Sequence, residues 1–342
     1  MNYVNLGNSG LKVSRIGLGM MTFGDAAWRP WILGLDDARP IFRRAAELGI
    51  NFFDTADMYS AGASEEITGR LVREFCNRDE VVVATKFHHP VDMAFSSGQP
   101  VGKPKPPVRP NMSGQSRKRI FAAVDSSLTR LGLDYIDLYQ PHRFDPSTPM
   151  DEVMEALHDV VKAGKVRYIG ASSMWAWQFA KMQFIARERG WTRFVSMQNH
   201  YNLAYREEER EMIPFCRDQG VGLIPWSPLA RGFLAGTRKR GEKTAETSRG
   251  STDELLQAYY GQDADFDVLE ALSAVAGQRG VKNAEVAYAW LLSRPGVTAP
   301  IVGASKVWQI EDAVKALDIT LSAGERDALE SPYRPHRVIG HA

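Results

Sequence analysis

The sequence has few cysteines and no long apolar run. Its 342 residues include only Cys76 and Cys216, which lie far apart and form no Cys-x-x-Cys pair. That spacing indicates neither a disulfide framework nor a zinc site. No apolar stretch reaches the roughly 18 residues that a membrane-spanning helix needs, and the N-terminal residues lack the basic and apolar regions of a signal peptide. We therefore expect free thiols, a reducing compartment and a cytoplasmic protein.

An excess of charge of one sign is also absent. The chain has 42 Lys and Arg residues against 41 Asp and Glu residues, which gives a formal net charge of +1. Such a balance creates no field that would concentrate nucleic acid or an anionic membrane surface. We expect a small molecule as the partner, and the residues indicate no particular oligomeric state.

The chain does show a regular alternation of two kinds of segment. Short β-branched runs alternate with longer segments of helical period, which is typical of strands buried under crossover helices. The predicted strands are RIGLG, NFFDT, VVVATKF, YIDLYQ, VRYIGAS, FVSMQ, GLIPW and PIVGA. The predicted helices cover residues 36–48, 65–73, 115–131, 151–162, 175–189, 207–218, 265–279 and 306–317.

This alternation predicts an α/β fold, a (β/α)8 TIM barrel with a short N-terminal hairpin and residues 1–342 in one domain. Repeated right-handed crossovers can close such a ring. A doubly wound sheet is the alternative, but its G-x-G-x-x-G fingerprint is missing because GLGMMTFG has the wrong spacing. The closed barrel is therefore favoured.

Two long segments interrupt the alternation, at residues 88–113 and 232–252. Each follows a predicted strand, so each should lie at the C-terminal face, where barrel active sites are found. We interpret the first as a lid over the substrate and the second as a clamp on cofactor phosphates. The alternative is a pair of mobile surface insertions.

Four polar residues come at or just after the ends of successive strands: Asp54, Tyr59, Lys86 and His142. A phenol is a weak acid, and a neighbouring ammonium favours its phenolate. Lys86 suits that role, and Asp54 can balance the ammonium in a cleft where an unpaired charge would be costly. His142 could orient a carbonyl oxygen. A lone charge at a strand end is often only a solvated terminus, but four together favour catalysis.

The strings FFDTADMY, ATKF, LYQPHR, YIGASS and PWSPLARG resemble those of the aldo-keto reductase superfamily, over nearly the whole chain. Within it the chain looks similar to a bacterial branch that also resembles the potassium-channel β subunits, judged by TFG, SSM, WSPLARG and VGAS.

The resemblance implies reduction of aldehydes or ketones with NADPH by a tetrad of Asp54, Tyr59, Lys86 and His142. Hydride would pass from nicotinamide C4 to the carbonyl carbon, and Tyr59 would deliver the proton. The resemblance implies no metal.

It also implies a set of cofactor contacts along the strand ends. Trp226 would stack on the nicotinamide ring, although a core aromatic is the alternative for this residue. Asp54, Ser172, Ser173 and Gln198 would lie at the nicotinamide end, Ser227, Leu229 and Arg231 along the pyrophosphate, and Arg249 would close over it.

The segment PIVGASKVWQIEDAV resembles the family's adenosine-phosphate site. Gly303 and Ser305 would lie at a helix N-terminus, which favours a phosphate, and Lys306 adds a charge that favours NADPH over NADH. Gln309 and Asp312 would contact ribose or adenine. Ala313 and Ser173 stand where many relatives have asparagine, which leaves the cofactor affinity open.

Trp28, Trp31, His88 and His89 are candidates for the substrate pocket, or else loop residues packed on their neighbours. Two other functions remain as alternatives. An NADPH-binding, redox-sensing regulatory subunit is disfavoured because His142 is kept. A metal-dependent barrel hydrolase would need further histidine or carboxylate ligands at strand ends.

Overall fold

The computed structural model describes residues 1–93, 107–241 and 248–341, with the side chains of Ser248, Arg249 and Glu254 left out. Its strands are β1 (Tyr3–Asn5), β2 (Lys12–Ser14), β3 (Gly17–Gly19), β4 (Phe52–Asp54), β5 (Val82–Phe87), β6 (Ile136–Pro141), β7 (Val166–Ser172), β8 (Phe194–Gln198), β9 (Gly222–Leu223) and β10 (Ile301–Gly303). Its α-helices are α1 (Leu35–Glu47), α2 (Ala63–Phe75), α4 (Arg117–Leu131), α5 (Met150–Lys162), α6 (Ala176–Arg189), α7 (Met212–Asp218), α8 (Ser248–Thr252), α9 (Glu254–Tyr259), α10 (Asp263–Arg279), α11 (Asn283–Leu292), α12 (Val307–Lys315) and α13 (Ala323–Glu330).

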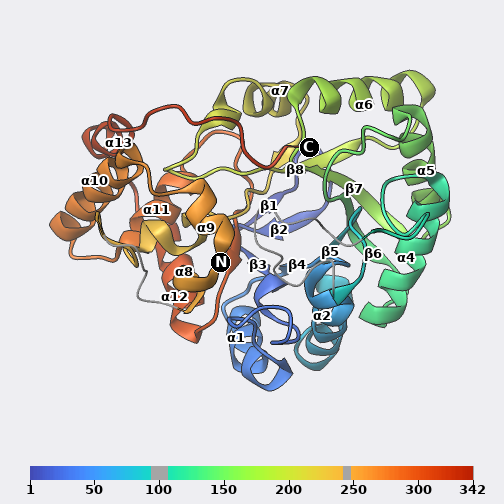
Figure 1. Ribbon diagram of the computed structural model, residues 1–342, viewed down its shortest axis with the longest axis horizontal. Helices are drawn as coiled ribbons and strands as arrows, with labels where there is room; N and C mark the ends of the chain where they lie inside the picture. The colour runs from blue at the N-terminus through green and yellow to red at the C-terminus, as the bar shows by residue number, and fades with distance from the viewer. Residues whose placement is uncertain (94–106, 242–247, 342) are drawn as a thin grey trace.

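The predicted (β/α)8 barrel is confirmed. Eight parallel strands follow the order β10-β3-β4-β5-β6-β7-β8-β9, and helices surround them in Figure 1. Parallel bridges from Leu223 to Val297 and from Trp226 to Ile301 join the two ends of that order. The backbone N–H of Ile301 donates to the Pro225 carbonyl at 2.9 Å across this seam, so the sheet closes on itself.

The predicted N-terminal hairpin is also present, as the antiparallel pair β1 and β2. Its residues Leu6 and Val13 belong to one buried cluster with Phe52, Leu138 and Ile224 from the barrel strands. Side chains alternate between the two faces of a strand, so these strand residues fill the barrel interior. The hairpin therefore covers the barrel end that is remote from the strand carboxyl ends.

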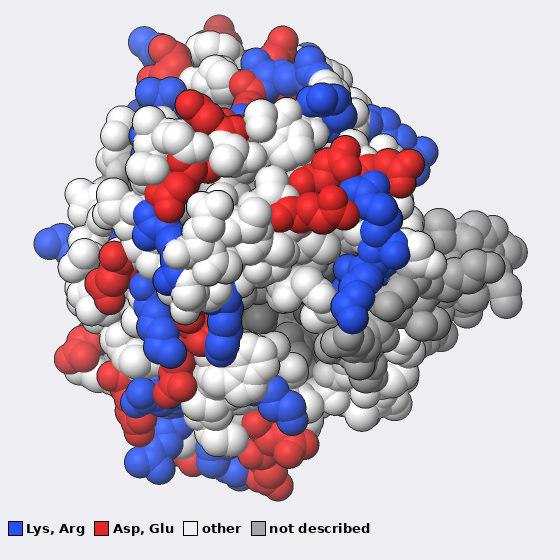
Figure 2. Space-filling view, turned by 90° about the vertical axis from the view of Figure 1, so that its left-hand side faces the viewer, with Lys and Arg blue, Asp and Glu red and all other residues white. Residues whose placement is uncertain are grey.

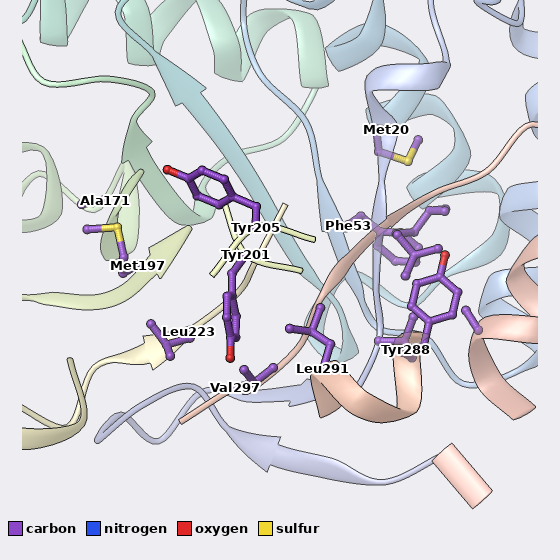
Figure 3. Close-up of a cluster of buried hydrophobic side chains, with 14 of the residues drawn as sticks. Met20, Phe53, Ala171, Met197, Tyr201, Tyr205, Leu223, Tyr288, Leu291 and Val297 are labelled. Carbon is purple, nitrogen blue, oxygen red and sulfur yellow. The ribbon is translucent and has the colours of Figure 1, made fainter. Parts of the chain in front are cut away.

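The outward-facing strand residues form a larger core with the helices. Figure 3 shows part of it, with Phe53 and Met197 from the strands and Tyr288 and Leu291 from α11. Helix α11 was not predicted. Most of its residues are buried, from Glu285 to Leu291, and a helix that is apolar on all sides lacks the amphipathic period by which helices are recognised in a sequence.

Residues 232–252 were predicted to be a long loop, and this prediction was partly wrong. The segment contains the end of a 3-10 helix, Ala230–Ala235, and all of α8. Residues 242–247 lie outside the described part of the chain, as do residues 94–106 of the segment 88–113. The lid and clamp roles of these two segments therefore stay predictions.

The surface and the cysteines agree with the composition. Figure 2 shows basic and acidic side chains interspersed over one face. Cys76 and Cys216 are free thiols. Within the described ranges, no helix combines the length and the apolar character needed to cross a membrane.

Close packing of α2 on α4 predicts a strong effect at Gly69. A Cβ atom there would lie 1.7 Å from the Leu131 carbonyl oxygen, a backbone atom that cannot swing aside. Gly69→Ala should destabilise the protein by at least about 2 kcal/mol through overpacking, measured by urea denaturation. Gly277→Ala is the matched control, because its Cβ would meet nothing within 4 Å, and alanine should stabilise that helix by about 0.5–1 kcal/mol. Equal effects of the two substitutions would contradict the packing argument.

Candidate active site

Strand alternation gathers the predicted residues at one end of the barrel. Phe52 lies in the interior cluster, so Asp54, two residues further on, also points inward. The same spacing carries Lys86 inward from Ala84 and Trp226 inward from Ile224. The strand register places Lys86 beside Gln140, and Ser172 beside Gln198. These side chains therefore meet at the carboxyl ends of the strands, where barrel active sites lie.

We call this end of the barrel, at the carboxyl ends of the strands, the mouth. A buried ion pair lies at its centre. Lys86 Nζ lies 2.5 Å from Asp54 Oδ2 and also donates to the Thr55 carbonyl at 2.7 Å. Both partners are almost fully buried. Burial alone would lower the pKa of the Lys86 ammonium, but the Asp54 carboxylate, followed by Tyr59, outweighs burial and raises it. Lys86 is therefore a fixed positive charge.

The second oxygen of the carboxylate is held by two amides. Gln198 Nε2 donates to Asp54 Oδ1 at 2.8 Å, and Gln140 Nε2 donates to the same atom at 3.2 Å. Gln140 was not predicted as a site residue, although its position two residues before His142 on an inward-facing strand was a signal for it. Gln198, predicted to contact the nicotinamide, thus also contacts Asp54.

Tyr59 and His142 lie beside the ion pair. Tyr59 starts a 3-10 turn, Tyr59–Gly62, and Lys86 Nζ lies 5.3 Å from the centre of its ring. The His142 ring meets it edge to face at a centroid distance of 5.6 Å. Burial, followed by the charge of Arg143, lowers the pKa of His142 well below its usual value, so the imidazole is neutral at physiological pH. Its buried Nδ1 has no hydrogen-bond partner within the described structure.

Trp226 is held by two neighbours. The His200 ring stacks on it, with centroids 4.1 Å apart and planes at 9°, and Tyr205 stacks on the far face of His200. Its indole N–H donates to Ser173 Oγ at 3.0 Å. Trp226 keeps a partly exposed surface. His200 is a further residue of the site that the sequence did not indicate.

Two other predicted nicotinamide contacts, Ser172 and Ser173, lie at the end of β7, which pairs with β8. Ser172 Oγ donates to the Gln198 carbonyl at 2.9 Å. Ser172 and Ser173 are both buried at the end of β7, so the structure brings them next to Gln198 and Trp226.

The segment after Trp226 turns sharply. Ser227 and Arg231 have φ angles of 53° and 59°, in the left-handed region that non-glycine residues rarely adopt. The Arg231 guanidinium is buried and pairs with Asp253 at 2.6 Å, while Ser227 and Leu229 are partly exposed. The Arg249 side chain lies outside the described residues.

The predicted phosphate site lies at the start of α12. Gly303 and Lys306 are exposed and Ser305 is half-buried. Gln309 Oε1 accepts from the backbone N–H groups of Ser305 and Lys306, at 2.7 and 3.0 Å. Asp312 is buried and pairs with Lys282 Nζ at 2.7 Å. The Gln309 side chain thus caps the N-terminus of α12, and a phosphate bound there would have to displace it.

The predicted pocket residues flank Tyr59 and His142. Trp28, Trp31 and Ile32 form a small buried cluster that packs against Tyr59, and the Trp28 and Tyr59 ring centres lie 6.0 Å apart. The His89 ring lies 5.2 Å from that of His142 and 4.8 Å from that of His88. Among described residues, no group of three or more His, Cys, Asp or Glu side chains could hold a metal ion.

The chain belongs to the aldo/keto reductase family, whose model matches residues 15–334. It is 46% identical to an aldo-keto reductase of Fusarium vanettenii, over 100% of this chain and 94% of that protein. It is 44% identical to versiconal hemiacetal acetate reductase of Aspergillus parasiticus, over 99% and 98% of the two chains. A Schizosaccharomyces pombe protein provisionally named an aryl-alcohol dehydrogenase is also 44% identical, over 99% and 97%.

These comparisons show an oxidoreductase that acts on carbonyl or alcohol groups. The three relatives come from fungi, and the similarity to a bacterial branch stays a prediction.

The buried pair predicts a non-additive effect on stability. Asp54→Asn leaves the Lys86 ammonium buried without a counter-charge and should cost about 3–5 kcal/mol of unfolding free energy. The double variant Asp54→Asn with Lys86→Met removes both charges, so it should be more stable than Asp54→Asn alone. Urea denaturation of the wild-type protein, Asp54→Asn, Lys86→Met and the double variant measures this. A double variant that loses the sum of the two single losses would contradict the coupling.

Proposed function

We propose that the protein reduces aldehydes or ketones to alcohols with NADPH, with Tyr59 as the proton donor. The observation that carries the proposal is the buried pair of Lys86 and Asp54 beside the Tyr59 ring and the neutral His142. We further propose that residues 1–342 act as one barrel domain and that the protein is cytoplasmic. The interspersed surface charges in Figure 2 support a small-molecule partner rather than nucleic acid.

Proton transfer from Tyr59 leaves a phenolate in the mouth. The Lys86 ammonium stabilises that negative charge because it lies close to the ring and is withdrawn from solvent. Asp54 keeps the ammonium charged and in place through its 2.5 Å contact. Asp54 and Lys86 thus act on the reaction through Tyr59, and Tyr59 donates to the carbonyl oxygen.

His142 has a different role, because its lowered pKa keeps the ring neutral. A neutral imidazole can donate one hydrogen bond to the carbonyl oxygen without competing with Tyr59 for the proton. The edge-to-face contact with Tyr59 places both groups on one side of the mouth. We propose that together they orient the carbonyl and polarise it.

The residues at the other side of the mouth fit a nicotinamide cofactor. Trp226 presents a partly exposed indole backed by His200, which suits stacking on a flat ring. Ser172, Ser173 and Gln198 offer polar groups beside it, next to Asp54. NADPH, when bound there, supplies the hydride from nicotinamide C4 to the carbonyl carbon.

The remaining predicted contacts would hold the rest of the cofactor. Ser227, Leu229 and Arg231 follow Trp226 along the chain, and Arg249 would close over the pyrophosphate. The adenosine-phosphate end would be bound by residues of β10, of α12 and of the turn between them, which are Gly303, Ser305, Lys306, Gln309 and Asp312. Lys306 is exposed, and a cation beside the ribose favours the 2′-phosphate of NADPH over the hydroxyl of NADH.

The test is the loss of NADPH absorbance, and separately of NADH absorbance, with aromatic and aliphatic aldehydes, dicarbonyls and ketones. Tyr59→Phe should still bind NADPH, as titrated by protein fluorescence, and should lose about 10²–10⁴-fold in kcat because the general acid is gone. Tyr135→Phe is the matched control, since that tyrosine lies just before β6, at the opposite end of the barrel, and should leave kcat unchanged.

Full activity of Tyr59→Phe would overturn its assigned role. Tight NADPH binding by the wild-type protein with no turnover of any carbonyl compound would favour the redox-sensing regulatory subunit instead.

A further inference from the structure

Arg143 is a charged residue of the mouth that the proposed chemistry does not use. It directly follows His142 after β6 and is partly buried. Within the described part of the chain its side chain makes one hydrogen bond, from Nη1 to the His142 carbonyl oxygen at 2.6 Å. Among the described residues no carboxylate lies within ion-pair distance of it.

Two other buried arginines each have a carboxyl group within ion-pair distance. Arg231 pairs with Asp253 at 2.6 Å, and Arg119 pairs with Asp57 at 3.3 Å. Withdrawing a guanidinium from water without a counter-charge is unfavourable. An anionic ligand that binds next to such a guanidinium would supply the missing counter-charge.

The Arg143 guanidinium lies between the two halves of the mouth. Its Cζ is 5.9 Å from the centre of the Trp226 ring. Burial lowers the pKa of Arg143, while the nearby Tyr259 and Tyr59 hydroxyls act in the opposite direction. An arginine keeps its charge under such conditions. The positive charge is therefore close to both Tyr59 and Trp226, the residues between which the carbonyl substrate would lie.

We propose that Arg143 binds an anionic group of the substrate, so that the protein prefers aromatic aldehydes or ketones that carry a carboxylate. The inference rests on the proposed reductase function. A guanidinium can hold a carboxylate through two parallel N–H···O bonds, which a point charge cannot reproduce.

The expectation of an aromatic substrate comes from the apolar residues beside Tyr59. Trp28 and Trp31 are buried beside Tyr59 in an apolar cluster, with the Trp28 ring 6.0 Å from that of Tyr59. Because Trp28 and Trp31 are almost fully buried, an aromatic ring would pack along the edge of this cluster while its carbonyl reaches Tyr59. A compound with an aromatic ring and a carboxylate would suit both this cluster and Arg143.

The experiment measures kcat/KM with NADPH for benzaldehyde, the three carboxybenzaldehyde isomers and their methyl esters. The esters are neutral and of similar size, so the ratio of acid to ester isolates the charge. In the wild-type protein at least one isomer should be preferred over its ester. Arg143→Met should lower that ratio about 10- to 100-fold, the loss expected for charge-assisted hydrogen bonds. Arg143→Lys should restore part of it.

The matched control is Arg167→Met. Arg167 is exposed in β7 and its guanidinium lies over Tyr135, so its loss should leave the ratio unchanged. An acid-to-ester ratio near one in the wild-type protein, or one that Arg143→Met does not change, would overturn the proposal. So would an Arg143→Met variant that loses NADPH affinity and reduces acids and esters equally poorly, because Arg143 would then serve the cofactor. In each of these cases ester turnover remains measurable in the wild-type protein, whereas failure of the reductase function would abolish turnover of every compound.

Discussion

The contact between Lys86 and Asp54 is the interaction on which the rest of the mouth depends. An ammonium without solvent access is tolerated only with a counter-charge and satisfied hydrogen bonds. Asp54 provides the charge at 2.5 Å, and the Thr55 carbonyl accepts a further bond. The free oxygen of Asp54 in turn needs donors, which Gln140 and Gln198 supply. Four strands thus each place one inward residue on a single charge network, and their register cannot shift without breaking it.

This network explains why neighbouring groups can differ in charge. Lys86 stays cationic because a carboxylate touches it, whereas His142 stays neutral because burial and nearby positive charges oppose its protonation. Arg143 adds a second cation that no described carboxylate balances. The mouth is therefore electropositive inside a protein of nearly zero net charge. Such a local field suits an anionic cofactor and, as we propose, an anionic substrate.

The alternation of strand and helix patterns was enough to predict the barrel. Asp54, Lys86, Tyr59 and His142 could be predicted to lie together because each is a polar residue at or after the end of an apolar strand. Gln140 was not predicted because it lies inside its strand, and only its contact with Asp54 shows that it belongs to the site. His200 was missed because its role depends on stacking between Tyr205 and Trp226, which no spacing along the chain reveals. Helix α11 was missed because a helix buried on all sides has no polar face. The partners that Gln309 and Asp312 have in the structure, the Ser305 N–H group and Lys282, could not be predicted because no spacing along the chain specifies them.

We propose that this mouth brings a carbonyl group and a nicotinamide together for direct transfer of hydride. The most direct test uses NADPH deuterated at C4 on either face, with an aldehyde that the protein reduces. We expect one of the two labelled cofactors to place deuterium on the carbinol carbon of the alcohol, detected by mass spectrometry and NMR. Alcohol that carries no deuterium at that carbon with either cofactor would contradict direct transfer and, with it, the function assigned to this site.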